Sequence, residues 1–131
     1  MRPVCLSIVA ALILGVSFAS PAFAIVQFYN VFKEDYLDNH PDKDYAAAVN
    51  KASDKCFVCH QGKNRKHHNT FGVHLVELLD RKKDMKDKEK IKAEIAKVMA
   101  MHIDPKDDKS ETYADRVKAS KWPGGELDEL K

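Results

Sequence analysis

Two segments in the second half of the chain repeat apolar residues with the spacing of an α-helix. Within residues 71–79 the apolar side chains follow an i, i+4, i+7, i+8 pattern, and Asn69 or Thr70 is a candidate N-cap just ahead of it. Residues 91–102 carry the same pattern and extend it by one turn, to His102. Each pattern predicts a helix, because this spacing gathers the apolar side chains on one face.

Two further stripes lie in the first half of the chain. Apolar positions within residues 45–56 keep helical spacing, and we expect this helix to begin near Asp42 or Asp44. Aromatic side chains within residues 28–36 stand at i, i+4 and i+8, a spacing that allows either a short helix or an extended arm lying on the domain.

The last predicted helix lies near the end of the chain. Residues 108–111 have the sequence of a capping box, which predicts a helix carrying Tyr113 and Val117. We expect this helix to stop at the Trp-Pro-Gly-Gly sequence of residues 122–125 and the acidic tail beyond it to be loose.

Length and composition indicate a single folded domain. Of the 131 residues 32% are charged, and only 5 are glycine and 5 proline, so both a disordered chain and a turn-rich β protein are disfavoured. No alternation of apolar and polar residues is long enough to predict a sheet, so the fold class we expect is all-α, with about four helices. The net charge of +2 is too small to indicate nucleic-acid binding.

The first 24 residues have the pattern of a cleaved secretory signal peptide. A positive start at Arg2 precedes an apolar run over residues 4–18, and an Ala-Phe-Ala cleavage sequence ends at Ala24. The run is shorter than the ~20 residues that a membrane-spanning helix needs. We therefore expect residues 25–131 to form one exported, periplasmic domain with no transmembrane anchor. Its net charge is about +1, because Arg2 leaves with the signal.

Residues 56–60 read Cys-Phe-Val-Cys-His, the C-x-x-C-H spacing that attaches a haem covalently. In this spacing Cys56 and Cys59 form the two thioether bonds, and His60 is the proximal ligand of the iron. If the segment is helical, the three side chains share one face, as a flat porphyrin requires. We expect His60 to bind iron through Nε2 while a backbone carbonyl or a polar neighbour holds its Nδ1 proton. Cys5 lies in the signal, so the mature chain has no other thiol.

The signal peptide and the C-x-x-C-H motif together resemble those of the small exported c-type cytochromes. The rest of the chain is similar to them only in general plan, with one helix before the motif and several after it. The resemblance implies a cytochrome c-like fold around one covalently bound haem c, and a single-electron carrier rather than an enzyme. In such a fold, the aromatic rings of residues 28–36 either pack in the core or wall the haem crevice.

The two cysteines also allow interpretations without haem. They could bind zinc together with His67 or His68, in a zinc-stabilised exported binding module. They could instead form a redox dithiol or a strained local disulfide. The zinc interpretation leaves His60 without a role, and the redox interpretation lacks the βαβ context that usually accompanies such a dithiol.

The sequence leaves the sixth ligand of the iron open. The candidates are Met101, His74, Met99 and His102, and the two methionines precede the last predicted helix, where many small c-type cytochromes carry this ligand. An electron carrier usually fills the sixth position. Without a protein ligand there, the chain would be a five-coordinate haem protein that binds a diatomic gas or reacts with peroxide, so peroxidase-like activity stays open.

Basic side chains gather just after the motif. Lys63, Arg65 and Lys66 precede His67 and His68, in a loop that we expect to be solvated. This cluster is a candidate docking surface for a redox partner protein, while acidic side chains concentrate in the C-terminal third of the chain. The alternative is an ordinary solvated charged face.

Overall fold

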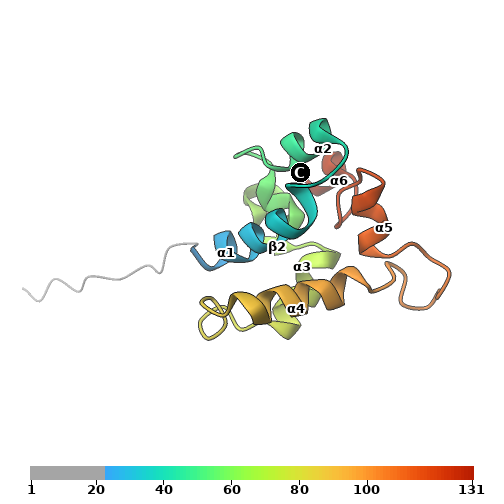
Figure 1. Cartoon of the computed structure of the whole chain (residues 1–131). Coiled ribbons are helices and arrows are strands. Elements are labelled where there is room, and N and C mark those ends of the chain that lie inside the picture. Colours follow the sequence, from blue (N-terminus) through green and yellow to red (C-terminus); the bar gives the residue numbers. More distant parts are fainter. Residues whose placement is uncertain (1–22) are drawn as a thin grey trace, which may run out of the picture.

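The computed structural model describes residues 23–131, which form a mostly helical domain (Figure 1). The expected all-α class is confirmed, although these residues contain more helices than the four predicted. The α-helices are α1 (Phe23–Phe32), α2 (Lys43–Val49), α3 (Thr70–Leu78), α4 (Lys88–Met99), α5 (Tyr113–Lys118) and α6 (Leu127–Leu130).

Shorter elements complete the chain between these helices. A π-helical turn, η1 (Lys33–Leu37), continues α1, so the short helix is the correct alternative for residues 28–36. The 3-10 turns are η2 (Lys55–Val58) and η3 (Lys63–Arg65). Two antiparallel strands, β1 (His60–Gln61) and β2 (His67–His68), pair His60 with His68 on either side of η3.

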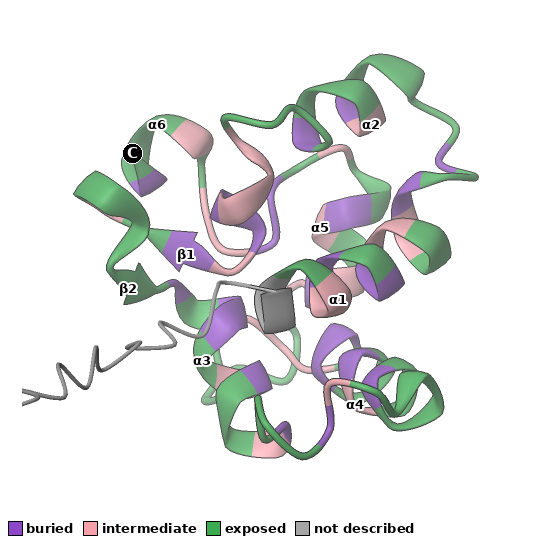
Figure 2. Ribbon diagram, turned by 90° about the vertical axis from the view of Figure 1, so that its left-hand side faces the viewer, coloured by how far each residue is buried: buried purple, intermediate pink, exposed green. Residues whose placement is uncertain are grey.

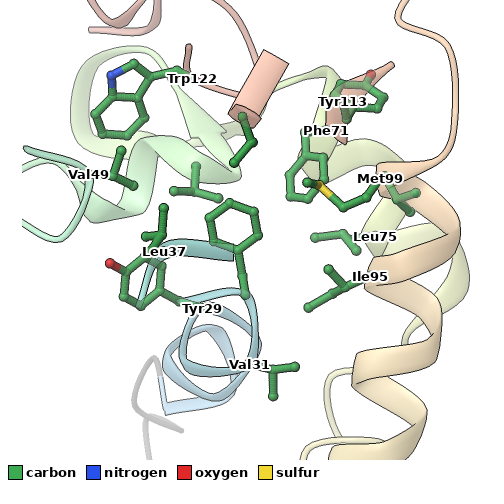
Figure 3. Packing of buried hydrophobic residues seen from close by; sticks show 14 of the residues in the cluster. Tyr29, Val31, Leu37, Val49, Phe71, Leu75, Ile95, Met99, Tyr113 and Trp122 are labelled. Carbon is green, nitrogen blue, oxygen red and sulfur yellow. The ribbon is translucent and has the colours of Figure 1, made fainter. Parts of the chain in front are cut away.

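Helices α1, α3 and α4 surround the hydrophobic core. Helix α4 packs against both of the others, and the apolar stripe predicted for residues 91–102 forms its buried face as far as Met99. Met99 and Ile95 of α4 point toward Phe71 and Leu75 of α3 (Figure 3). The largest of its fully buried side chains are Tyr113, Phe32, Phe71, Ile91, Ile95 and Met99.

Side-chain caps fix the starts of three helices. Asp42, Asn69 and Asp87 each accept a hydrogen bond at 2.9 Å from the backbone N–H three residues further on. They cap α2, α3 and α4, and so pair N–H groups that would otherwise lack a partner. The predicted helix starts near Asp42 and at Asn69 are therefore confirmed.

Two predictions for the C-terminal part are wrong. The last turn of α4 closes on the N–H of Ala100, so His102 lies beyond the helix and forms an isolated antiparallel bridge with Thr112. The predicted helix carrying Tyr113 and Val117 is present as α5, but its capping box consists of Thr112 and Asp115 rather than residues 108–111, and it ends at Lys118, before the Trp-Pro-Gly-Gly sequence.

The acidic tail is ordered, which also differs from the prediction. Helix α6 packs beside β1 (Figure 2). The side chain of Leu130 is buried, and its carbonyl oxygen accepts a hydrogen bond from the backbone N–H of Gly62 at 2.7 Å. One apolar side chain and one backbone hydrogen bond therefore hold the tail against the strand pair that follows the motif.

The predicted signal peptide falls on residues 1–24, most of which lie outside the described residues. Helix α1 begins at Phe23, next to the expected cleavage point. Among the helices of residues 23–131, none has the length and apolar character needed to span a bilayer.

Candidate functional site

The C-x-x-C-H motif is not one helix, in contrast to the expectation. Its first cysteine lies in η2, and the chain then turns at Cys59 into β1, where His60 begins the strand. The helix cannot continue because the Cys59 carbonyl accepts the backbone N–H of Asn69 at 2.9 Å and His60 pairs with His68. Cys56 and Cys59 are free thiols and partly buried, while His60 is 8% exposed.

Two small apolar pockets meet at Cys59. One encloses about 30 Å³ and is lined by Val26 and Tyr29 of α1 together with Lys55, Cys56 and Cys59. The other encloses about 50 Å³ and lies between α1 and α3. Its lining residues are Phe28, Cys59, His60, His68, Gly72, Leu75 and Val76. Both thiols and the imidazole therefore border apolar space under α1.

Apolar side chains remain exposed beside these pockets. Within the described residues the large hydrophobic side chains classed as exposed are Val26, Val73 and Val76, which are 40%, 42% and 51% exposed. Val26 lines the pocket at Cys56, and Val76 lines the pocket at His60. Exposed apolar side chains at the edge of an apolar pocket can contact an apolar group that binds there.

The imidazole of His60 is neutral at pH 7. Burial lowers the pKa of His60, and the neighbouring His68, whose ring centroid is 4.7 Å away, lowers it further. Its Nδ1 atom is buried and has no hydrogen-bond partner, so the partner that we expected for this nitrogen is absent. A neutral ring is the form in which histidine binds a metal.

The thiol of Cys59 stays protonated at neutral pH, so Cys59 is not the attacking thiol of a redox dithiol. Burial, and then the neighbouring Cys56, raise the pKa of the Cys59 thiol to about 12. Reactive thiols in redox proteins have lowered pKa values instead. The zinc interpretation is not supported either, because residues 23–131 hold no group of three or more His, Cys, Asp or Glu side chains arranged for a metal ion.

The residues present fit a covalently bound haem in their donor chemistry and in their apolar surroundings. The two thiols are free, and the imidazole is neutral. The enclosed space is small, since pockets that hold ligands of drug size enclose about 300–1,000 Å³. A group of that size would therefore also extend over Val26 and Val76, the exposed valines that line the two pockets.

The candidate sixth ligands lie elsewhere. His74, Met101 and His102 line one pocket of about 590 Å³ beside the loop that joins α4 to α5. His74 is two residues from Gly72 and so projects from the opposite face of α3, at about 200° around the helix. Met99 is 2% exposed and fills the core. The structure thus brings three of the candidates together, away from Cys56, Cys59 and His60.

The aromatic side chains of α1 divide between core and site. Phe32 is buried in the core, and Tyr36 stacks on it with a centroid separation of 5.5 Å. Phe28 lines the pocket at His60, and Tyr29 lines the pocket at Cys56. The rings of residues 28–36 therefore divide between the core and the two pockets at the motif.

The basic loop after the motif is held in an unusual backbone conformation. Asn64 and Arg65 have φ of 63° and 56°, a region that side chains seldom adopt. The Arg65 guanidinium donates a hydrogen bond to the Ser53 carbonyl at 2.7 Å and lies over the Phe57 ring, which holds the loop against η2. Lys63 and Lys66 stay exposed. His68 is also exposed, as expected, yet its ring borders the His60 pocket.

Two residues of the site were not identified as such from the sequence. Gly72 packs so closely on the motif that a Cβ atom there would lie 2.0 Å from the Cys59 carbonyl oxygen. Asn69, predicted only as a helix cap, also contacts the motif. A glycine inside a helix was the one available signal, since it lowers helix stability unless close packing requires it.

Comparisons with family models, with curated proteins and with solved structures found no match for this chain.

Proposed function

We propose that this protein is an exported mono-haem c-type cytochrome that carries single electrons. The observation that carries the proposal is the convergence of three groups on two apolar pockets that share Cys59: two free thiols in C-x-x-C-H spacing, and a neutral, buried imidazole. The first 24 residues support export, because c-type haem is attached outside the cytoplasm in the family that the motif resembles.

Each residue of the motif has a distinct role in this proposal. Cys56 and Cys59 hold the haem through thioether bonds, and His60 ligates the iron. When bound, the haem supplies an iron that passes between the ferric and ferrous states. Phe28, Leu75 and Val76 provide the apolar wall of the pocket at His60.

A redox partner is proposed to dock at Lys63, Arg65 and Lys66. These exposed or partly exposed side chains lie on the loop that joins the paired strands β1 and β2, so they are close to His60. A partner with an acidic surface would be steered to this loop. We expect Lys63→Glu to slow electron transfer with an acidic partner at low salt, and 0.5 M salt to remove the difference from the unchanged protein.

Acid extraction tests covalent attachment directly. Protein made with an intact cytochrome c maturation system should keep its haem through denaturation and acid-acetone extraction. Cys56→Ser and Cys59→Ser should each leave a single thioether and sharply lower the holoprotein yield, and His60→Ala should abolish it. Cys5→Ser is the matched control, because this residue lies in the signal. Complete loss of pigment from the unchanged chain on extraction would contradict the proposal.

A five-coordinate haem protein that binds a diatomic gas or reacts with peroxide is the second candidate. It is favoured by one observation, the position of His74, Met101 and His102 around a pocket on the far side of α3 from the motif. An open coordination position is what such chemistry requires.

A further inference from the structure

The side chain of Asn69 contacts the motif at three places. Its Nδ2 atom donates to the carbonyl oxygens of Phe57 at 2.9 Å, Val58 at 3.1 Å and His60 at 3.4 Å. The residue is 1% exposed, so these interactions are shielded from water. One amide group has two N–H bonds, and here they are shared among three carbonyl groups of the same five-residue segment.

The other polar atoms of Asn69 are also paired. Its Oδ1 accepts the backbone N–H of Gly72 at 2.9 Å, which caps α3, and its own N–H donates to the Cys59 carbonyl at 2.9 Å. Asn69 therefore joins the start of α3 to four of the five residues of the motif. No other polar side chain among residues 23–131 forms hydrogen bonds to the backbone of more than one motif residue.

The C-terminal turn fixes the amide from the opposite side. A Cβ atom on Gly124 would lie 2.1 Å from Nδ2 of Asn69, so the glycine backbone packs directly on the amide group. The neighbouring Pro123 is fully buried. Arg116 holds this turn by donating a hydrogen bond to the Trp122 carbonyl at 2.9 Å. The amide has little room to rotate away from the motif.

We propose that Asn69 is a positioning residue for the motif: it fixes the turn at residues 57–60 so that both thiols and the His60 imidazole border the apolar surface under α1. The role in haem attachment rests on the proposed function. Its physical basis is that an asparagine can cap α3 through its oxygen and bind the motif carbonyls through its nitrogen at the same time.

Asn69→Asp separates these two tasks. Aspartate has the same size and keeps an oxygen to cap α3, but it places a second oxygen against three carbonyl oxygens. Asn69→Ser is the second variant, for the case in which the aspartate variant fails to fold. The serine hydroxyl can still cap the helix, and serine introduces no charge. Asp87→Ala is the matched control. It removes the carboxylate that caps α4 by accepting a hydrogen bond from the Lys90 backbone N–H at 2.9 Å, and it leaves the motif unchanged.

The experiment compares the full chain and these variants after expression with a cytochrome c maturation system. Covalent haem per polypeptide should fall at least fivefold in Asn69→Asp and Asn69→Ser and stay within twofold of the unchanged protein in Asp87→Ala. In the holoprotein that remains, the haem-methyl proton shifts, which depend on the orientation of the axial imidazole, should change only in the Asn69 variants. Normal yield and unchanged shifts in both Asn69 variants would overturn the inference.

A second measurement separates this inference from the proposed function. Without added haem, Cys59 should be alkylated by iodoacetamide at least fivefold faster in Asn69→Ser than in the unchanged protein, while Asp87→Ala should show no change. Absence of haem from the unchanged protein would defeat the proposed function, and this rate would still test the position of the motif. Equal rates in all three proteins would defeat the role of Asn69.

Discussion

Burial keeps the thiol and the imidazole at the centre of the site uncharged. The pKa of Cys59 is raised to about 12 and that of His60 is lowered, in both cases chiefly because the groups are withdrawn from water. An uncharged thiol and imidazole can border apolar surface at far smaller free-energy cost than the corresponding ions. Neither group therefore opposes an apolar cofactor seated beside it.

Cys59 should be unreactive in the folded protein without haem. Only the thiolate attacks an alkylating agent, and a thiol with a pKa near 12 is ionised to roughly one part in 10⁴ at pH 8. We expect iodoacetamide to modify Cys59 at least tenfold more slowly than it modifies free cysteine, with the label assigned by fragment-ion masses. Unfolding in urea should remove the difference. If Cys59 in the folded protein reacted as fast as free cysteine, its thiol would not be withdrawn from water.

The first turn of helix α3 packs closely against the backbone of the motif. Gly72 lets the first turn of α3 approach the Cys59 carbonyl, and Asn69 holds that turn to the neighbouring carbonyls. The next turn of the same face, at Leu75 and Val76, lines the pocket at His60. A displacement of α3 would therefore alter the pocket and the motif together.

Gly72→Ala tests this close approach, because the packing and the helix propensity predict opposite changes in the free energy of unfolding. On helix propensity alone, alanine would stabilise the protein by up to about 1 kcal/mol. A Cβ atom 2.0 Å from the Cys59 backbone forces the elements apart instead, so we expect the free energy of unfolding to fall by about 1–3 kcal/mol. Denaturant titration measures the change, and Val73→Ala, at a largely exposed position of the same helix, should alter it by less than about 0.5 kcal/mol. Stabilisation by Gly72→Ala would contradict the packing described.

The free energy of unfolding should fall in acid, because carboxylates accept hydrogen bonds in the turn before α4 and at the start of α5. Hydrogen bonds from the Lys90 ammonium and the Asp80 backbone lower the pKa of Asp84, and those from Thr112 lower the pKa of Asp115. A lowered folded-state pKa gives a contribution that is complete above the unfolded value of about 4 and is lost as the pH falls through the folded value.

We therefore expect these carboxylates to leave the midpoint temperature of thermal unfolding nearly constant between pH 7 and pH 5. At pH values below 4 the midpoint temperature should decrease. Asp84→Asn should lower the midpoint at pH 7 and make the drop in acid smaller. The exposed Asp128→Asn is the control and should leave the profile unchanged. An Asp84→Asn profile parallel to that of the unchanged protein would contradict the assignment.

The elements that local signals define could be predicted from the sequence. Asp42 and Asn69 cap helices whose apolar stripes follow directly, so α2 and α3 begin where the pattern places them. Contacts between distant residues could not be predicted in this way. The burial of Leu130 against the strand pair orders α6, and the pairing of His60 with His68 ends the helical geometry of the motif. The roles proposed for Cys56, Cys59 and His60 rest on their spacing in the sequence, whereas the contacts of Asn69 with the motif depend on the tertiary fold.

Across the whole molecule, α3 lies between the motif and the candidate sixth ligands. Gly72 and Val76 face His60, while His74 faces the pocket beside the α4–α5 loop, with its ring 6.0 Å from that of Tyr113. Met101 lies beyond the end of α4 and is partly buried, so it is less constrained than Met99 in the core. The electron-carrier proposal requires one side chain from this second group to reach the iron in the holoprotein.

Carbon monoxide binding by the reduced holoprotein distinguishes the two proposed functions. For the electron carrier we expect a low-spin ferrous spectrum and poor carbon monoxide binding, because a protein ligand fills the sixth position. A ferric charge-transfer band from methionine to iron that is lost in Met101→Ala and kept in Met99→Ala would identify Met101. A bis-histidine spectrum lost in His74→Ala or His102→Ala would identify that histidine instead. Rapid binding to a high-spin ferrous protein would contradict electron transfer as the function and favour the gas-binding or peroxide-reacting alternative, since only an open position admits the ligand.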